Sequence, residues 1–317
     1  MFFEVSGVTV SPLIPFSVAF FVSLFTSTAG VSGAFLLLPF QVSMLGFTSP
    51  AVSPTNLVYN IVAIPSGVYR YMREKRMAWP LAWVIIVGTL PGIFIGALIR
   101  ILYLPDPKNF KFFAGCVLLY IGLRLVYAII KKNDVTIERA KAVEERFYTG
   151  KNKEAIVSEN EANPLPAVRT VKFSFKRYSY SFYGETFTFN TIGLLVLSFI
   201  VGIVGGTYGI GGGAIIAPFL VAYFGLPIYT IAGATLMATF VTSIAGVAFY
   251  AGIAPLFAHT GLSIAPDWTL GALFGAGGFL GIYCGARLQK FLPAKIIKII
   301  LILTMTFIAI RYIANIF

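Results

Sequence analysis

The sequence predicts an all-α polytopic membrane protein made of two inverted-topology repeats, each with about five helices and one glycine-broken helix. Hydrophobic residues make up 58% of the 317 residues and charged residues only 11%, whereas a soluble domain has roughly 25% charged residues. Long apolar runs flank a polar segment, and one glycine-rich stretch occurs in each half. We therefore divide the chain into a first membrane repeat (1–130), a small cytoplasmic insertion that links the repeats (131–190) and a second membrane repeat (191–317).

The glycine-rich stretch aligns without gaps between residues 30–40 and residues 209–219. The identical pairs are Gly30 and Gly209, Gly33 and Gly212, Pro39 and Pro218, and Phe40 and Phe219. Glycine costs helix stability and permits unusual backbone angles, so each copy predicts a broken helix. In a membrane, the freed backbone groups are tolerated only inside protein or beside a water-filled cavity. Matching breaks in two halves therefore indicate a transporter's substrate site.

Five helices are expected in the first repeat. They cover residues 12–29, 33–45, 50–69, 79–102 and 109–130. No basic region precedes the first run, so we expect a membrane helix there and not a cleaved signal peptide. The fourth helix carries Gly88, Gly92 and Gly96, which form a smooth stripe where another helix can approach closely.

The second repeat follows the same plan. Its expected helices are 191–207, a short segment from the break to Gly225, 227–250, 268–288 and 295–314. The run 92–97 resembles 281–286, which pairs the two glycine-striped spans. Between the repeats we expect a short amphipathic helix at 134–148, a flexible part at 149–167 and a β-hairpin within 171–189, where apolar and polar residues alternate around Gly184.

Charge indicates orientation. Lys and Arg gather in 70–76, in 131–190 and in 287–298, whereas 251–266 has none. Because basic loops stay in the cytoplasm, we place the first three inside and 251–266 outside, with both termini outside the cell inner (cytoplasmic) membrane. The repeats then have opposite orientations. Five crossings per repeat satisfy this inversion, and so do three if the short segments re-enter.

Chemistry by side-chain carboxylates is disfavoured. The chain has only four acidic residues outside the insertion, namely Glu4, Glu74, Asp106 and Asp267. Its single histidine, His259, is in a predicted loop. Cys116 and Cys284 lack metal-ligand spacing. We expect no catalytic residue, no enzyme activity, no metal and no cofactor. The expected partners are a small anionic substrate and the lipid bilayer, not nucleic acid, with a homodimer left open.

An anion site needs no charged side chain, because helix N-termini present free N–H groups and the positive end of the helix dipole. A new helix begins after each break. The predicted substrate-binding residues are Gly30, Ser32, Gly33, Asn56, Tyr59, Gly209, Gly211, Gly212, Gly213 and Thr235, with Pro39 and Pro218 as helix-break or gating residues. Further polar residues flank the breaks: Thr28, Asn60, Thr207, Tyr208 and Thr239. Arg100, Arg124 and Arg311 are expected to snorkel to the membrane surface.

These residues resemble the signature of the sulfite exporter TauE/SafE family of membrane permeases. The similarity lies in Gly-Val-Ser-Gly at 30–33, Asn56-Leu57, Gly209-Ile-Gly-Gly-Gly and the Pro-Phe pairs, and it extends over about 15–130 and 190–315. The resemblance implies a secondary carrier that exports small sulfur-containing anions by alternating access, such as sulfite, sulfoacetate or other organosulfonates. The negative cytoplasm would drive such an anion outward.

Other functions stay open at this stage. An anion channel fits the same breaks, and some members of the family import a sulfur oxyanion. Gly30-Val-Ser32-Gly33 also matches the Gly-x-Ser-Gly of rhomboid-type intramembrane serine proteases, with His259 as a base. Gly211 stands at the equivalent of Ser32, so a repeated helix break explains the pattern better. A scaffold acting through 131–190 is the remaining alternative.

Overall fold

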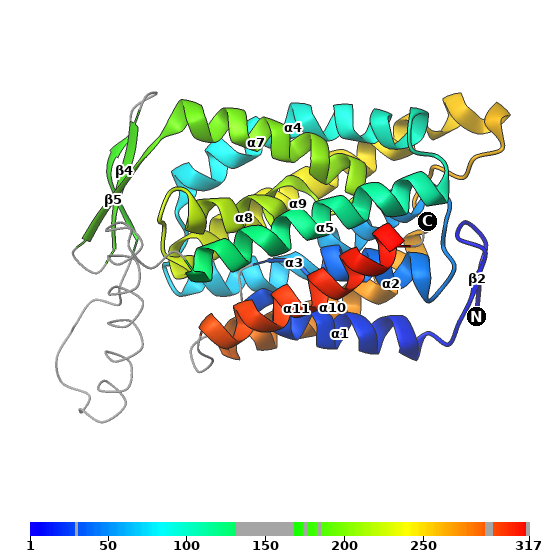
Figure 1. The fold of residues 1–317 in the computed structure, drawn as a ribbon, viewed down its shortest axis with the longest axis horizontal. Coiled ribbons are helices and arrows are strands. Elements are labelled where there is room, and N and C mark those ends of the chain that lie inside the picture. Colours follow the sequence, from blue (N-terminus) through cyan, green and yellow to red (C-terminus); the bar gives the residue numbers. More distant parts are fainter. Residues whose placement is uncertain (29–30, 131–167, 174–176, 183–184, 289–293, 315–317) are drawn as a thin grey trace.

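The computed structural model describes residues 1–28, 31–130, 168–173, 177–182, 185–288 and 294–314, most of which are helical (Figure 1). Within these residues, four helices are long and apolar enough to cross a membrane. The predicted all-α polytopic class is therefore confirmed, and the chain is a multi-pass membrane protein. The helix predicted at 134–148 and the flexible part at 149–167 lie outside the described residues.

The first half begins with a two-stranded antiparallel hairpin, β1 (Phe2–Phe3) and β2 (Val8–Thr9). Its helices are α1 (Leu13–Thr28), α2 (Ala34–Ser43), α3 (Val52–Arg73), α4 (Trp79–Leu102) and α5 (Pro107–Ile130). These bounds follow the apolar runs of the sequence closely. The exception is α3, which continues through its basic end until Lys75 adopts a positive φ of 54°.

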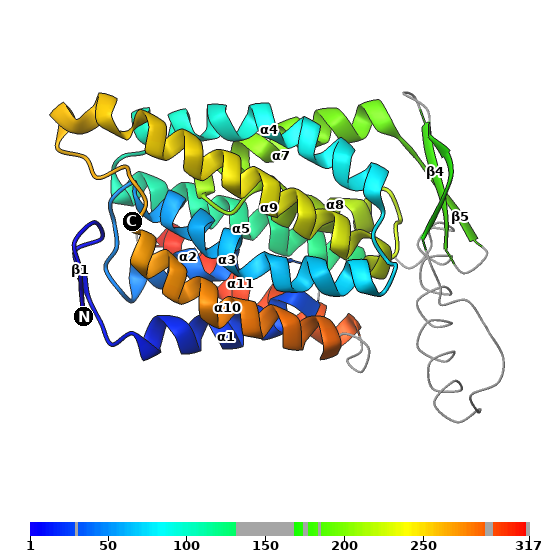
Figure 2. The same ribbon diagram turned by 180° about the vertical axis from the view of Figure 1, so that it is seen from behind.

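The second half contains α7 (Thr191–Tyr208), α8 (Gly212–Ala222), α9 (Ile228–Ile253), the 3-10 helix η1 (Ala254–Thr260), α10 (Trp268–Leu288) and α11 (Ala294–Ala314). The start of α7 is capped by Asn190, whose Oδ1 accepts from the backbone N–H groups of Ile192 and Gly193. The segment 251–266, expected to be a loop, contains the last residues of α9 and the whole of η1. Both termini and η1 lie at one end of the bundle (Figures 1 and 2).

The two glycine stripes pack against the first helix of the opposite half. A Cβ at Gly96 of α4 would lie 2.2 Å from the carbonyl oxygen of Ile203 on α7. A Cβ at Gly277 of α10 would lie 2.0 Å from the carbonyl oxygen of Phe16 on α1. Real Cβ atoms cannot approach a carbonyl so closely, so both contacts require glycine. This reciprocal packing supports the predicted duplication.

Each broken helix folds into a hairpin whose short arm returns toward the start of the long arm. The start of α1 contacts α10 at Gly277, and the aromatic ring of Phe40 near the end of α2 packs on Phe274, one turn away on α10. In the second half, Phe224 just beyond α8 packs on Phe189 just before α7. Each half therefore contains one helical hairpin, α1 with α2 and α7 with α8; the number of full crossings per repeat stays a prediction.

A three-stranded antiparallel sheet lies at the end of the bundle opposite to the termini (Figures 1 and 2). Its strands are β3 (Arg169–Phe173), β4 (Arg177–Phe182) and β5 (Glu185–Asn190). The predicted hairpin around Gly184 corresponds to β4 and β5, where Phe182 pairs with Glu185. Tyr180 attaches the sheet to α9 through a 2.8 Å hydrogen bond between its hydroxyl and Thr230 Oγ1. Burial raises the pKa of the Tyr180 phenol, so the hydroxyl stays neutral and keeps this contact.

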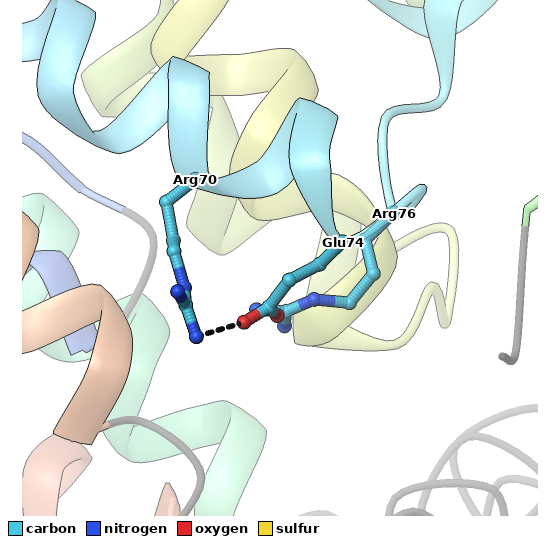
Figure 3. Close-up of polar contacts among 3 residues, drawn as sticks. All are labelled: Arg70, Glu74 and Arg76. Atoms are coloured by element: carbon cyan, nitrogen blue, oxygen red, sulfur yellow. Dashed lines mark ion pairs between the residues drawn. The ribbon is translucent and has the colours of Figure 1, made fainter.

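The basic loop after α3 is held by one carboxylate between two guanidinium groups (Figure 3). Glu74 Oε1 lies 2.7 Å from Arg70 Nη2, and Glu74 Oε2 pairs with Nη2 of the buried Arg76. The same loop also contacts the residue just before β3, because the N–H of Val168 donates to the Lys75 carbonyl oxygen at 3.1 Å. Glu74 therefore orders the junction between the membrane helices and the insertion.

Replacing Glu74 by glutamine is expected to lower the free energy of unfolding by about 3 kcal/mol, because it removes the carboxylate from two largely buried guanidinium groups. Thermal unfolding of the purified protein measures this change. The control is Glu4→Gln, which removes the same charge from an exposed residue near the N-terminus. Equal melting temperatures for the two variants would show that the Glu74 ion pairs contribute nothing.

Candidate functional site

The first break places a tyrosine hydroxyl against the start of α2. The Gly33 N–H donates to Tyr59 Oη at 3.2 Å, and Tyr59 Oη lies 2.7 Å from Ser23 Oγ. A Cβ at Gly33 would lie 2.8 Å from Tyr59 Oη, so this approach needs glycine. Beside them Ser32 is fully buried, and its Oγ has no hydrogen-bond partner among the described residues.

The second break uses backbone conformations that only glycine adopts easily. Gly209 has φ 81° and ψ 32°, and Gly211 has φ 76° and ψ 151°. The start of α8 then packs tightly on α9, because a Cβ at Gly213 would lie 2.1 Å from the carbonyl oxygen of Thr235. Ser243 Oγ lies beside Gly211, is buried, and has no hydrogen-bond partner within the described part of the chain.

Asn56 on α3 joins the two breaks. Its Nδ2 donates to the carbonyl oxygen of Ala34, at the start of α2, and to the carbonyl oxygen of Gly209, both at 2.9 Å. Its Oδ1 accepts from Gln41 Nε2 at 3.1 Å. The two breaks, separated by about half of the chain, therefore meet at one fully buried amide.

Two more side chains donate to carbonyl groups at the breaks. Asn60 Nδ2, one turn beyond Asn56, donates to the carbonyl oxygen of Ile210 at 3.1 Å. The hydroxyl of Tyr208, at the end of α7, donates to the carbonyl oxygen of Phe35 at 3.1 Å. Together with the bonds from Asn56, four carbonyl oxygens at the breaks already have side-chain donors.

The helix starts at the breaks have no cap from their own N-cap residues, although the Gly33 N–H has a side-chain partner, Tyr59 Oη. Gly33 precedes α2 and Gly211 precedes α8, and neither provides a side-chain cap. The first N–H groups of a helix have no partner within that helix, so an uncapped start presents donors and a partial positive charge. Four carbonyl oxygens at the breaks are thus occupied while backbone donors remain, which favours an anion. Gln41 Oε1 and Asn60 Oδ1 are buried acceptors without a hydrogen-bond partner in the described part of the chain.

The other predicted site residues fall in different places. Gly30 lies outside the described residues. Thr235 Oγ1 donates to carbonyl oxygens of its own helix, at Ile231 and Ala232, so its backbone and not its hydroxyl faces Gly213. Helices α2 and α8 continue past Pro39 and Pro218. The prediction that the prolines break the helices is therefore wrong, and the breaks are made by the glycines before them.

Sequence reasoning missed three residues at the site: Ser23, Gln41 and Thr89. A Cβ at Gly212 would lie 2.4 Å from Thr89 Cγ2, so Thr89 shapes the start of α8 from α4. Gln41 is a polar residue within the short apolar run after the first break, and that signal could have identified it. The roles of Ser23 and Thr89 depend on packing between helices and had no such signal.

The site residues are closed off from solvent. Ser32, Asn56, Tyr59 and Asn60 are all fully buried. A cavity of about 430 Å³ lies at the C-terminal part of α2, where Pro39 and Phe40 meet Lys111 of α5 and Arg311 of α11. The conformation is therefore occluded at the breaks, with a basic cavity on the side where the termini lie.

Comparison with known proteins agrees with this architecture. The sequence model of the family described as sulfite exporter TauE/SafE matches residues 15–312, which is nearly the whole chain and includes both breaks. The chain belongs to the sulfite exporter TauE/SafE family. The resemblance inferred from the breaks is thus confirmed, and the protein is a membrane transporter of this family.

A relative of this TauE/SafE protein is known from Bacillus subtilis (strain 168). It is described as the probable membrane transporter protein YunE and is 23% identical over 285 residues, which cover 87% of the present chain and 89% of the relative. No solved structure matches the chain. The structure disfavours the protease alternative. The candidate nucleophile Ser32 is fully buried, whereas the candidate base His259 is exposed on η1.

Proposed function

We propose that this TauE/SafE transporter exports small sulfur-containing anions, such as sulfite, sulfoacetate or other organosulfonates, across the cytoplasmic membrane by alternating access. The substrate binds at the meeting point of the two breaks. The observation that carries the proposal is the division of hydrogen-bonding groups there: side-chain donors occupy the carbonyl oxygens of Ala34, Phe35, Gly209 and Ile210. The N–H groups that follow Gly33 in α2 and Gly211 in α8 are left as donors for the substrate.

Unpartnered hydroxyl groups add to these donors. Ser32 Oγ belongs to the first break and Ser243 Oγ to the second, and both are buried without a partner in the described structure. A buried hydroxyl without a hydrogen bond is unfavourable, and sulfonate or sulfite oxygens would accept from both. This arrangement serves a small oxyanion with several acceptor oxygens better than a halide, which presents one acceptor centre.

The proposed direction of transport rests on the distribution of basic residues and on the membrane potential. The loop 70–76 and the insertion are basic, and the strands β3 to β5 of the insertion lie at the end of the bundle opposite to the N-terminus (Figure 1), so the expected orientation places this end in the cytoplasm. With the cytoplasm negative, the membrane potential favours outward movement of an anion by about 2.3 kcal/mol per charge per 100 mV. Export then needs no intramembrane carboxylate, which agrees with the placement of the acidic residues at segment ends.

Ligand-induced stabilisation of the purified protein tests the proposal. A ligand that binds the folded state raises the melting temperature, so sulfite, sulfoacetate, taurine, thiosulfate, sulfate and chloride are compared at equal ionic strength. We expect a shift with a sulfite-like or sulfonate anion and none in Gly212→Leu, whose side chain would fill the start of α8. A panel that shifts the two proteins equally, or neither of them, would contradict the assigned site and substrate class.

A further inference from the structure

Arg100 on α4 does not reach the membrane surface as the sequence analysis expects. It is fully buried, with Phe110 of α5 packed against its guanidinium. Its guanidinium carbon lies 3.8 Å from the ring centroid of Phe110 on α5, and Nη1 donates to the carbonyl oxygen of Leu104. Within the described residues, no carboxylate lies close enough to form an ion pair with it.

Two nitrogen atoms of the guanidinium make no hydrogen bond to the described residues. Nε and Nη2 are buried and have no hydrogen-bond partner in the described parts of the chain. These two groups form one edge of the planar guanidinium, which can donate two parallel hydrogen bonds to an oxyanion. The ring of Phe110 compensates part of the charge by a cation–π contact. A buried charge whose Nε and Nη2 hold three of its five N–H donors unused is nevertheless costly unless an anion joins it.

Arg100 lies next to the second break. On α4 it follows Gly96 by one helical turn, and the Gly96 carbonyl oxygen accepts from Thr207 Oγ1 at 3.1 Å, near the end of α7. The Phe110 ring under the guanidinium lies 6.3 Å from the ring of Tyr208, whose hydroxyl contacts α2. Arg100 is thus one layer of side chains away from the point where both breaks meet.

The duplication offers no architectural reason for this arginine. Gly96 aligns with Gly285 in the second glycine-striped span, so the equivalent of Arg100 is Gln289. Tight packing between a striped helix and the first helix of the other half therefore does not itself require a charge at this position. The basic cavity lies close to this arginine, which has no basic equivalent in the second repeat. Lys111, which lines the cavity, directly follows Phe110 in the sequence.

We propose that Arg100 is a second anion-binding residue of the pathway, which receives the substrate oxyanion through Nε and Nη2 between the breaks and the end that carries the termini. This inference rests on the proposed anion transport. It requires a ligand with at least two acceptor oxygens on one centre, as in a sulfonate, sulfite, carboxylate or phosphate, and it predicts poor binding of chloride.

Arg100→Met, which keeps the length and removes the charge, is the main test. Melting temperatures of the purified protein are measured without ligand and with increasing sulfite, sulfoacetate, acetate and phosphate. We expect the ligand-free melting temperature to stay equal or rise, because an unpaired buried charge is lost. The apparent dissociation constant of the oxyanion should rise about tenfold or more, because two charge-assisted hydrogen bonds are lost.

Arg124→Met is the matched control. Arg124 also lies over aromatic rings, 5.7 Å from the Tyr120 centroid and 5.2 Å from that of Phe219, but away from the breaks on α5. It should keep wild-type affinity. Arg100→Lys retains the charge without the two-donor edge and should bind several-fold more weakly than the wild type; this variant decides the question if Arg100→Met does not fold.

Wild-type affinity in Arg100→Met or, if that variant does not fold, in Arg100→Lys would overturn the inference. A lower ligand-free melting temperature with unchanged affinity would do the same and assign Arg100 a structural role. If the wild type binds acetate or phosphate instead of sulfur anions, and Arg100→Met loses that binding, the sulfur-anion function fails while the role of Arg100 stands. If the wild type binds no oxyanion, both proposals fail.

Discussion

Replacing Gly213 by alanine is expected to abolish transport while the protein still inserts into the membrane. The added Cβ would lie 2.1 Å from the carbonyl oxygen of Thr235 and 2.5 Å from Thr239 Oγ1. The carbonyl belongs to α9 and cannot turn away, so the start of α8 must move. Overpacking of this kind costs about 1–3 kcal/mol, and the movement separates the N–H groups of α8 from the substrate. Flux of radioactive sulfite from proteoliposomes measures the loss.

Gly252→Ala is the matched control for this experiment. Gly252 lies near the end of α9, and an added Cβ there would have no atom within 4 Å. This variant should transport like the wild type, which separates the position of the glycine from the substitution itself. Wild-type flux and melting temperature in Gly213→Ala would show that the second break is not part of the site.

Asn56→Asp is expected to lose both substrate binding and much of the protein's stability. The Asn56 amide donates to two carbonyl oxygens at 2.9 Å. An ionised carboxylate of the same shape has no donor and repels both oxygens. The free energy of unfolding should fall by about 3 kcal/mol or more, because these buried acceptors lose their hydrogen bonds. Thermal unfolding and the ligand-induced shift report the two effects.

An exposed asparagine provides the comparison. Asn109→Asp makes the same chemical change in the first turn of α5, where the side chain is exposed to solvent, and should leave stability and binding nearly unchanged. Asn56→Ala should fall between this control and Asn56→Asp, since it removes the donor without adding a charge. If Asn56→Asp melts like Asn109→Asp, Asn56 does not hold the breaks together.

Much of the fold could be predicted because glycines, prolines and charges delimit the apolar runs. The span 79–102 coincides with α4, and the breaks lie at the glycines as expected. The hairpin around Gly184 was also predictable from alternation, whereas pairing of β3 to its edge depends on contacts made in three dimensions. The helices α2 and α8 fold back along α1 and α7 because of the neighbours they contact, which composition alone left undecided.

The site could be predicted in outline but not in its hydrogen bonds. Asn56 was identifiable as a polar residue in an apolar helix, but its contact with Gly209 joins residues that are 153 positions apart. Thr235, its equivalent in the second repeat, bonds within its own helix. Arg100 differs from its expected position because Phe110 of α5 packs against its guanidinium, a contact that forms only in three dimensions. Repetition in sequence thus predicts paired breaks, while the partner of each polar group follows from packing between the halves.

The most direct test of the central claim, that the paired breaks form the site of a sulfur-anion carrier, is flux in proteoliposomes under an imposed membrane potential. We predict sulfite or sulfonate movement that saturates with concentration, increases when the compartment holding the anion is made negative, and disappears in Gly213→Ala. Sulfur-anion flux equal to that of protein-free liposomes, or unsaturated flux with single-channel currents, would contradict a carrier mechanism at these breaks.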